Sequence, residues 1–224
     1  MRWRCYRPWA GCRACPPRIT VDVVPDRFSS RAGPHDRGGF PPRGCPAEAA
    51  GSMMSIMTML RLGYHGDLSE ILGMFDEAVA WLSGLGRQDQ WGSVPWSAVP
   101  ERVQGVRSTL DSGALWIAEV DGEVAGALVL GEQPPSYVPA VAEPELYVRL
   151  LLTSRRLRGR GIGTALLEHA RGQATRRRIG LLRVDCWAGG DGRLVRYYVE
   201  AGFSPTERFD RDGWPGQVLE QRLV

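Results

Sequence analysis

A run of glycine and arginine residues in the second half of the chain has the residue types and spacing that phosphate binding requires. Gly159, Gly161 and Gly163 lie between an apolar run that ends at Thr153 and a helical pattern that begins near Gly161. The first N–H groups of a helix lack intrahelical partners, and the helix dipole is positive at that end. Glycine also lets an anion approach the backbone without meeting a Cβ atom. Residues 158–164 are therefore predicted to bind phosphate, the alternative being a tight strand–helix turn.

Two common phosphate loops are excluded by this spacing. No Gly-Lys-Ser/Thr follows the glycines, so the loop is not a P-loop, and it does not read G-x-G-x-x-G. The preceding strand also lies in the middle of the chain, after a β-hairpin, which disfavours a Rossmann unit. A nucleotide-binding α/β protein that prefers ATP or NAD stays open as a weaker alternative.

The elements around the loop predict an α/β domain with a mixed sheet and helices on both faces. Asp67-x-x-Glu70 has the form of a capping box, and Asp121-Gly122 between two β-rich runs predicts a hairpin. A nearly continuous apolar run over 146–153 predicts a buried central strand. The expected order is β-α-α-β-β-β-α-β-α-β-β, with strands at 59–64, 115–120, 123–130, 146–153, 181–187, 206–209 and 217–223, and helices at 68–82, 100–110, 161–178 and 193–201.

Two motifs resemble those of one enzyme family. Arg158-x-x-Gly161-x-Gly163 matches the Q/R-x-x-G-x-G/A signature of the GNAT superfamily of N-acetyltransferases. Residues 197–203, Tyr-Tyr-Val-Glu-Ala-Gly-Phe, resemble the family's Y-x-x-x-G-F. The resemblance covers about residues 58–224 and implies a GNAT-like α+β fold with a mostly antiparallel sheet. It also implies an enzyme that transfers an acetyl group from acetyl-CoA to a primary amine.

The resemblance assigns roles to particular residues. Tyr198, four residues before Gly202, aligns with the tyrosine that protonates the CoA sulfur, and Tyr197 is expected to be structural. Asp191 stands where the family has an asparagine, which removes the usual side-chain contact to pantetheine. Thr153 stands where the family usually has valine, a change that a backbone contact tolerates. The expected CoA contacts are Leu151, Leu152 and Thr153 for pantetheine and Arg158, Gly159, Arg160, Gly161, Ile162, Gly163 and Thr164 for the pyrophosphate.

Direct attack on the thioester requires a neutral amine and therefore a base. Glu145 and Asp185 lie on strands that flank the expected cleft, and either could be a solvated or structural carboxylate. Glu145 is taken as the base. A non-catalytic acyl-CoA-binding module is the alternative function; it would bind CoA without turnover.

Aromatic residues mark the expected acceptor pocket. Trp91, Trp96, Tyr137 and Trp214 lie in the early helices, their loops and the last hairpin. They predict either an aromatic wall suited to a hydrophobic or cationic amine, or ordinary core packing. The acceptor itself is not specified. A homodimer is compatible with the resemblance, because dimers are common in the family, but no residue pattern specifies one.

The first 52 residues differ from the remainder. They carry nine arginines against four acidic residues, are rich in proline and glycine, and show no useful period. We expect them to be a disordered or mis-called N-terminal extension, with the catalytic domain at 53–224. Four of the five cysteines lie there, including one C-x-x-C; incidental cysteines are the preferred interpretation over a zinc module, so no metal is expected.

Charge and hydropathy limit the partners. Beyond residue 52 the chain has nineteen basic and twenty-one acidic residues, which gives no reason to expect nucleic acid. No apolar run reaches the roughly 18 residues of a membrane span, and no signal peptide is recognised. We therefore expect a cytoplasmic protein without a membrane partner.

Overall fold

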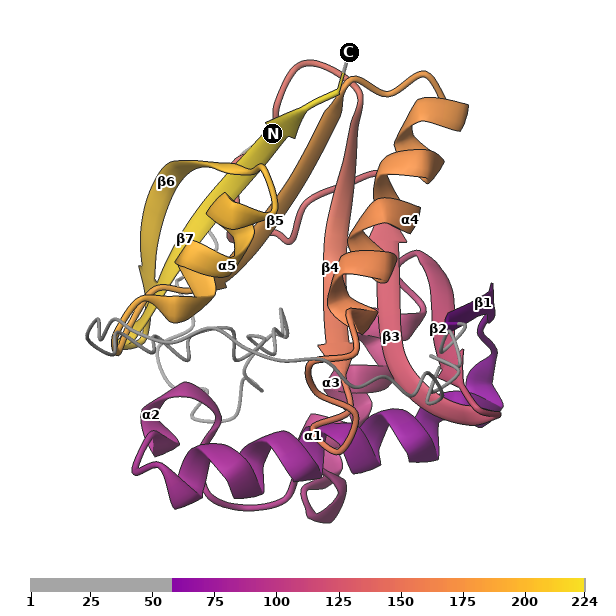
Figure 1. Ribbon diagram of the computed structural model, residues 1–224. Helices are drawn as coiled ribbons and strands as arrows, with labels where there is room; N and C mark the ends of the chain where they lie inside the picture. Colours follow the sequence, from indigo (N-terminus) through magenta and orange to yellow (C-terminus); the bar gives the residue numbers. More distant parts are fainter. Residues whose placement is uncertain (1–57, 224) are drawn as a thin grey trace, which may run out of the picture.

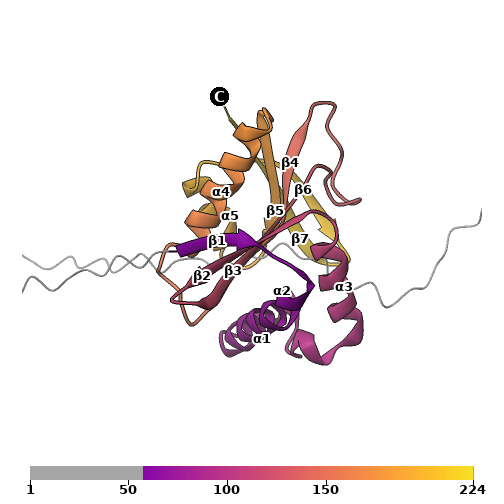
Figure 2. The same cartoon turned by 90° about the vertical axis from the view of Figure 1, so that its right-hand side faces the viewer.

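The computed structural model describes residues 58–223, which form a seven-stranded sheet covered by helices on both faces (Figures 1 and 2). The strands run in the order β1-β2-β3-β4-β5-β7-β6. Only β4 and β5 pair in parallel, and the other neighbours are antiparallel. The bounds are β1 Thr58–Leu62, β2 Ala114–Val120, β3 Glu123–Gly131, β4 Glu145–Thr153, β5 Leu181–Trp187, β6 Ser204–Arg211 and β7 Trp214–Arg222.

The helices divide between the two faces of the sheet (Figure 2). Helices α4 (Ile162–Arg176) and α5 (Arg193–Glu200) bury apolar side chains on one face, together with residues of β2 to β5 and β7. Helices α1 (Leu68–Gly84) and α3 (Pro100–Leu110) cover the other face of β2, β3 and β4. The short helix α2 (Gln88–Trp91) lies in a segment expected to be a loop. The predicted fold class is confirmed, and so is the predicted element order apart from the additional short helix α2.

Asp-Gly pairs form two tight hairpin turns. Asp121 and Gly122 have φ values of 53° and 81°, as a type I′ turn between β2 and β3 requires. Asp212 and Gly213, with φ values of 53° and 82°, make the same kind of turn between β6 and β7. The sequence predicts strands at 206–209 and 217–223 with a loop between them, so β6 and β7 both reach further towards the turn than expected.

The expected capping box at the start of α1 is wrong. Asp67 is 3% exposed, and its carboxylate makes no capping bond to the helix. It accepts hydrogen bonds from the Arg61 guanidinium at 2.7 and 3.0 Å and from the Tyr64 amide at 2.8 Å. Burial opposes ionisation of Asp67, but the hydrogen bonds from Arg61 and Tyr64 and the charge of Arg61 together outweigh it and lower the pKa. The carboxylate thus joins the end of β1 to the helix that follows.

Candidate active site

The two parallel strands in the middle of the sheet separate along their length (Figure 1). Their pairing runs from Glu145–Leu181 to Val148–Val184, and no described residue of β4 after Val148 pairs with β5. Arg149 is a bulge residue, because Leu150 pairs with Val129 and Val148 with Leu130 on the other side of β4. The later part of β4 therefore keeps its bonds to β3 while its other backbone edge faces an opening.

The glycine loop lies at the wide end of this opening, between β4 and α4. Gly159 and Gly161 have φ values of 78° and 73°, and a Cβ atom at either position would meet nothing within 4 Å. These glycines are therefore required by the backbone conformation and not by a lack of space. Gly161 precedes α4, whose first turn has no acidic residue and no side-chain cap. The unpaired N–H groups and the dipole of α4 make this end a suitable anion site.

Gly163 is required for a different reason. A Cβ atom there would lie 2.5 Å from the hydroxyl oxygen of Tyr197. Tyr197 belongs to α5 and is 7% exposed. The tyrosine expected to be structural thus packs its hydroxyl against the first turn of α4, which fixes the spacing of the two helices next to the loop.

Glu77 of α1 holds the start of the loop, a role that sequence reasoning missed. Its carboxylate accepts a hydrogen bond from the Ser154 hydroxyl at 3.0 Å and one from the Arg155 amide at 3.1 Å, and it pairs with Arg156 at 2.8 Å. Glu77 is a single acid on an amphipathic helix, and its position in the sequence gives no sign of this contact. It joins the helices of one face to the loop on the opposite side of β4.

Arginine side chains surround the loop. The Arg155 guanidinium lies 3.6 Å from the centroid of the Trp81 ring. Arg158 is exposed and lines a cavity of about 450 Å³, and Arg160 is 3.7 Å from the Asp121 carboxylate. Arg158 and Arg160 are both exposed, so they place positive charge at the surface of the loop.

That cavity, which we call the loop cavity, lies between the end of α1, α2, the glycine loop and the start of α5. Asp191 lines it and pairs with Arg87 and Arg193, each at 2.8 Å. Burial opposes ionisation of Asp191, but the hydrogen bonds from Arg87 and the Arg193 amide and the charges of both arginines together outweigh it and lower the pKa. The residue that replaces the family asparagine is thus a fixed anion held by two arginines.

Tyr198, the expected general acid, is fully buried on α5. It belongs to the apolar cluster that includes Leu151 of β4 and Cys186 of β5, the two strands that flank the opening. Its ring meets those of Tyr197 and Phe203 edge-on, at 5.4 and 5.5 Å between centroids. The side chain thus packs in the core on the face of β4 and β5 that α4 and α5 cover.

The expected aromatic wall divides into two groups. Trp91 and Trp96 are 5% and 1% exposed and pack with Phe75 in the core under α1. Tyr137 and Trp214 line a second cavity of about 270 Å³, together with one side of Trp91. We call this the hairpin cavity, because it lies between α2, the β3–β4 connection and the β6–β7 hairpin. Trp96 is therefore a core residue, whereas Tyr137 and Trp214 form part of the wall of the hairpin cavity.

Glu145, the expected base, lies away from the opening. It is at the closed end of the β4–β5 pair, about 10 Å along the strand before the pairing ends at Val148. Its carboxylate accepts a hydrogen bond from the Arg183 guanidinium at 3.1 Å, and both side chains are buried. Burial raises the pKa of Glu145, against the effect of Arg183. Glu145 thus pairs with a buried arginine in the paired part of β4 and β5, and its role as the base stays a prediction.

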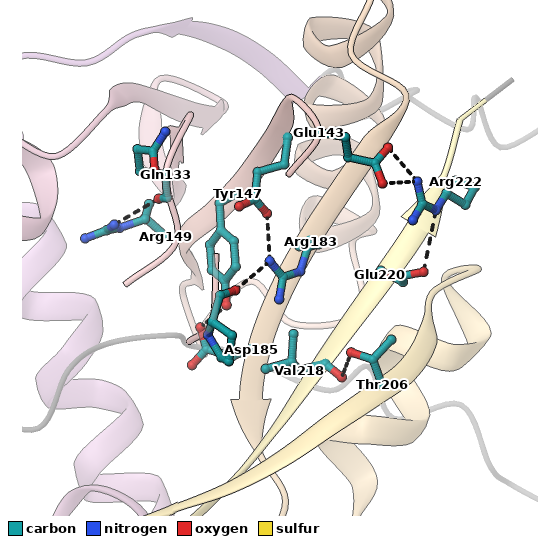
Figure 3. Close-up of polar contacts among 12 residues, drawn as sticks. Gln133, Glu143, Tyr147, Arg149, Arg183, Asp185, Thr206, Val218, Glu220 and Arg222 are labelled. Carbon is teal, nitrogen blue, oxygen red and sulfur yellow. Dashed lines mark hydrogen bonds and ion pairs between the residues drawn. The ribbon is translucent and has the colours of Figure 1, made fainter. Parts of the chain in front are cut away.

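Asp185 lies at the opening itself, immediately after the last β5 residue that pairs with β4. It is 1% exposed and accepts hydrogen bonds from the Tyr147 hydroxyl at 2.7 Å and the Tyr137 hydroxyl at 3.0 Å. Figure 3 shows Tyr147 beside Arg183 and Asp185. Burial and the Asp185 carboxylate both raise the pKa of each tyrosine, so that both phenols stay protonated. Asp185 is thus a buried carboxylate connected to the hairpin cavity through Tyr137.

Metal and membrane features are absent from the described part of the chain. No group of three or more His, Cys, Asp or Glu side chains in residues 58–223 is arranged to hold a metal ion. No helix in that range has the length and apolar character needed to cross a bilayer. The N-terminal cysteines and the expected extension lie outside the described residues.

Comparison with known proteins decides the family. The model of the acetyltransferase (GNAT) family matches residues 80–203, which contain the opening, the glycine loop and α5. This chain belongs to the GNAT family. It is therefore an enzyme of the N-acetyltransferase class, as the two motifs predicted. YesJ, an uncharacterized N-acetyltransferase of Bacillus subtilis, is 23% identical over 144 residues, which cover 62% of this chain and 77% of YesJ.

Solved GNAT structures share the fold. A GNAT family acetyltransferase from Listeria monocytogenes superposes with a TM-score of 0.56 at 18% identity, covering 74% of this chain and 95% of that one. A GCN5-related N-acetyltransferase from Rhodopseudomonas palustris gives 0.56 at 18% identity, covering 77% and 100%. YncA from Salmonella typhimurium, solved with its cofactor acetyl-CoA, gives 0.50 at 16% identity, covering 75% and 94%.

Proposed function

We propose that this chain transfers the acetyl group of acetyl-CoA to a primary amine by direct attack. The observation that carries the proposal is the opening between β4 and β5, with the N-terminus of α4 at its wide end. An extended thiol arm fits along an unpaired strand edge, and a pyrophosphate fits at a helix N-terminus. The acetyl-CoA-bound YncA supports the same choice of co-substrate.

The residues present fit such a co-substrate. Backbone amides over Gly159, Arg160, Gly161, Ile162, Gly163 and Thr164, with the Arg158 guanidinium, would hold the pyrophosphate. Backbone groups of Leu151, Leu152 and Thr153 would pair with pantetheine along the strand edge that β5 leaves free. Because this second contact uses the backbone, the threonine at 153 does not weaken it.

The reaction needs one proton removed and one proton supplied. The lone pair of the amine attacks the thioester carbonyl, and the C–S bond breaks as the tetrahedral intermediate collapses. We assign to Tyr198 the proton that the leaving thiolate takes, because it aligns with the family tyrosine and its side chain is buried in the same apolar cluster as Leu151 of β4 and Cys186 of β5. The amide product retains the acetyl group, and free CoA leaves as a thiol.

Asp185 replaces Glu145 in our assignment of the base. Its carboxylate is the first on β5 beyond the paired region, and Tyr137 connects it to the hairpin cavity. The substrate ammonium can give a proton to the Tyr137 hydroxyl while that hydroxyl gives its own proton to the Asp185 carboxylate. The raised pKa of Tyr137 suits this relay, because the phenol never has to remain ionised.

The proposal is tested by following CoA release with a thiol reagent while a panel of primary amines is offered to the full chain. Acetylated amine in equal amount to the released CoA is expected, with Asp185→Asn lowering kcat roughly 100-fold or more. Tight binding of acetyl-CoA without turnover of any amine would instead support a non-catalytic acyl-CoA-binding module. Preferential binding of ATP or NAD would overturn both.

A further inference from the structure

The hairpin cavity contains two arginines that the reaction described above does not use. Arg102 comes from α3 and Arg211 from the end of β6, and both side chains are half-buried on its wall. Asp89 and Asp212 also line the cavity, but among the described residues neither carboxylate forms an ion pair with either arginine. In contrast, the arginines Arg87 and Arg193 of the loop cavity share Asp191.

Arg102 is fixed in place without a counter-ion. Its Nη1 donates a hydrogen bond to the Val94 carbonyl at 3.0 Å, and its guanidinium carbon lies 5.4 Å from the centroid of the Trp96 ring. Gly92 leaves room for Nη2, which would lie 3.0 Å from a Cβ atom at that position. Burial lowers the pKa of Arg102, and no acidic group in residues 58–223 offsets this effect. A guanidinium has five N–H donors, so most of its capacity remains for a ligand.

Arg211 lies over an aromatic surface on the same wall. Its guanidinium carbon is 5.2 Å from the centroid of the Tyr137 ring. Tyr137 contacts Phe209 at 5.2 Å, and Phe209 stacks on Trp214 at 6.1 Å between centroids. Trp214 is tied to α2 by a hydrogen bond from its Nε1 to the Gln90 carbonyl at 3.2 Å. The cavity therefore combines two cations with a continuous apolar surface.

We propose that the hairpin cavity binds an amine acceptor that carries a carboxylate, an α-amino acid with an apolar or aromatic side chain, through Arg102 and Arg211. This inference rests on the proposed function and names the substrate class of the same site. Guanidinium and carboxylate match in geometry and can form two parallel hydrogen bonds. The Phe209–Trp214 stack receives the side chain, and the amine then points towards Tyr137 and Asp185.

The size of the cavity agrees with a single amino acid. Its volume of about 270 Å³ lies just below the roughly 300–1,000 Å³ of common ligand pockets, which suits a small acceptor. A folded protein substrate would present only its terminal residue here, and an internal lysine side chain brings no carboxylate to the two arginines. Free amino acids are therefore preferred over both.

The test compares each acid with a neutral partner of the same shape. L-phenylalanine and L-leucine are offered beside L-phenylalaninamide and L-leucinamide at saturating acetyl-CoA, and kcat/KM is measured for each. The amino group of the amide is less basic than that of the acid, so more of it is in the neutral, reactive form. Without a contact to the carboxylate, the amide is therefore expected to react faster. We expect the enzyme to prefer the acid roughly 10- to 100-fold, the range of a charged hydrogen bond. Equal rates, or a preference for the amides, would overturn the proposal.

Three variants identify the groups responsible. Arg102→Met and Arg211→Met should each lower kcat/KM for the acids while leaving the amides within a few-fold. Arg107→Met, on the same helix but outside the cavity, should change neither. If Arg102→Met instead weakens the Kd for acetyl-CoA, that arginine serves the co-substrate and the inference fails.

Failure of the proposed function is distinguishable from failure of this inference. Absence of acetyl-CoA binding by the full chain would remove the proposed function. Calorimetry that compares the binding of L-phenylalanine with that of L-phenylalaninamide would still report on the carboxylate site. Turnover of neutral amines with no preference for acids would keep the function and remove only the acceptor class.

Discussion

Replacing Gly163 by alanine tests how the glycine loop is positioned. The new Cβ atom would lie 2.5 Å from the Tyr197 hydroxyl oxygen, well inside contact distance. The next nearest atoms, Cζ of Tyr197 at 3.6 Å and Cγ2 of Thr153 at 3.9 Å, are at ordinary separations. The clash thus involves one oxygen atom, on a side chain that is 7% exposed and so has little room to move.

The expected cost follows from overpacking. Extra carbon in a filled site costs about 1–3 kcal/mol, and alanine returns up to ~1 kcal/mol of helix propensity. Gly163→Ala should therefore lower the free energy of unfolding by about 1–2 kcal/mol, or the melting temperature by roughly 2–8 °C for a domain of this size. Tyr197→Phe removes the oxygen, so the double variant should recover most of that loss.

Urea unfolding of the wild type, both single variants and the double variant gives the coupling energy. The matched control is Gly161→Ala, where φ is 73° and space is open, so the cost of about 1–2 kcal/mol is conformational. Tyr197→Phe should not rescue that variant. If the Gly163→Ala and Tyr197→Phe effects simply add, the contact between α4 and α5 is not what requires glycine at 163, and the reasoning is refuted.

Other predictions follow from the buried polar groups and α5. Glu145→Gln should lower the free energy of unfolding by about 1–3 kcal/mol through Arg183, yet leave kcat within a few-fold; a 100-fold fall would restore Glu145 as the base. Tyr198→Phe should lower kcat roughly 100-fold with an unchanged Kd for acetyl-CoA, whereas an unchanged kcat would make it a packing residue. Asp67 has a lowered pKa, so its ionised form stabilises the fold above the unfolded value near ~3.9, and this contribution is lost as pH falls through the folded pKa. Asp67→Asn should therefore destabilise the protein more at pH 7 than at pH 3, and an equal effect in urea melts at both pH values would contradict this.

Local rules were enough to predict much of the fold. Asp121-Gly122 between two β-rich runs specified its hairpin, and the apolar run before Thr153 specified a central strand. The second Asp-Gly turn at 212–213 was missed because Pro205, Pro215 and Gly216 disfavour strands. Pro205 is accommodated on the edge strand β6, which carries an irregularity there, whereas Pro215 and Gly216 lie at the start of the inner strand β7.

The site was less predictable, because long-range contacts decide it. Glycine conformations and the helix start at the loop are local, and they were readable from spacing alone. The contacts of Glu77 with Ser154 and of Tyr137 with Asp185 join residues 77 and 48 positions apart in the chain. A single sequence gives no sign of such pairs, and for the same reason Glu145 could not be distinguished from Asp185 before the strand register was known.

The measurement that tests the central claim most directly is a thermal melt of the full chain with and without acetyl-CoA, beside ATP and NAD. A ligand at about 100 times its Kd adds roughly 2.7 kcal/mol if it binds only the folded state, or about 5–11 °C for a domain of this size. The account predicts that rise with acetyl-CoA alone, and a smaller rise when Arg158→Met removes one cation from the loop. A cooperative melt that acetyl-CoA does not shift would contradict it and leave the glycine loop as a turn without a ligand.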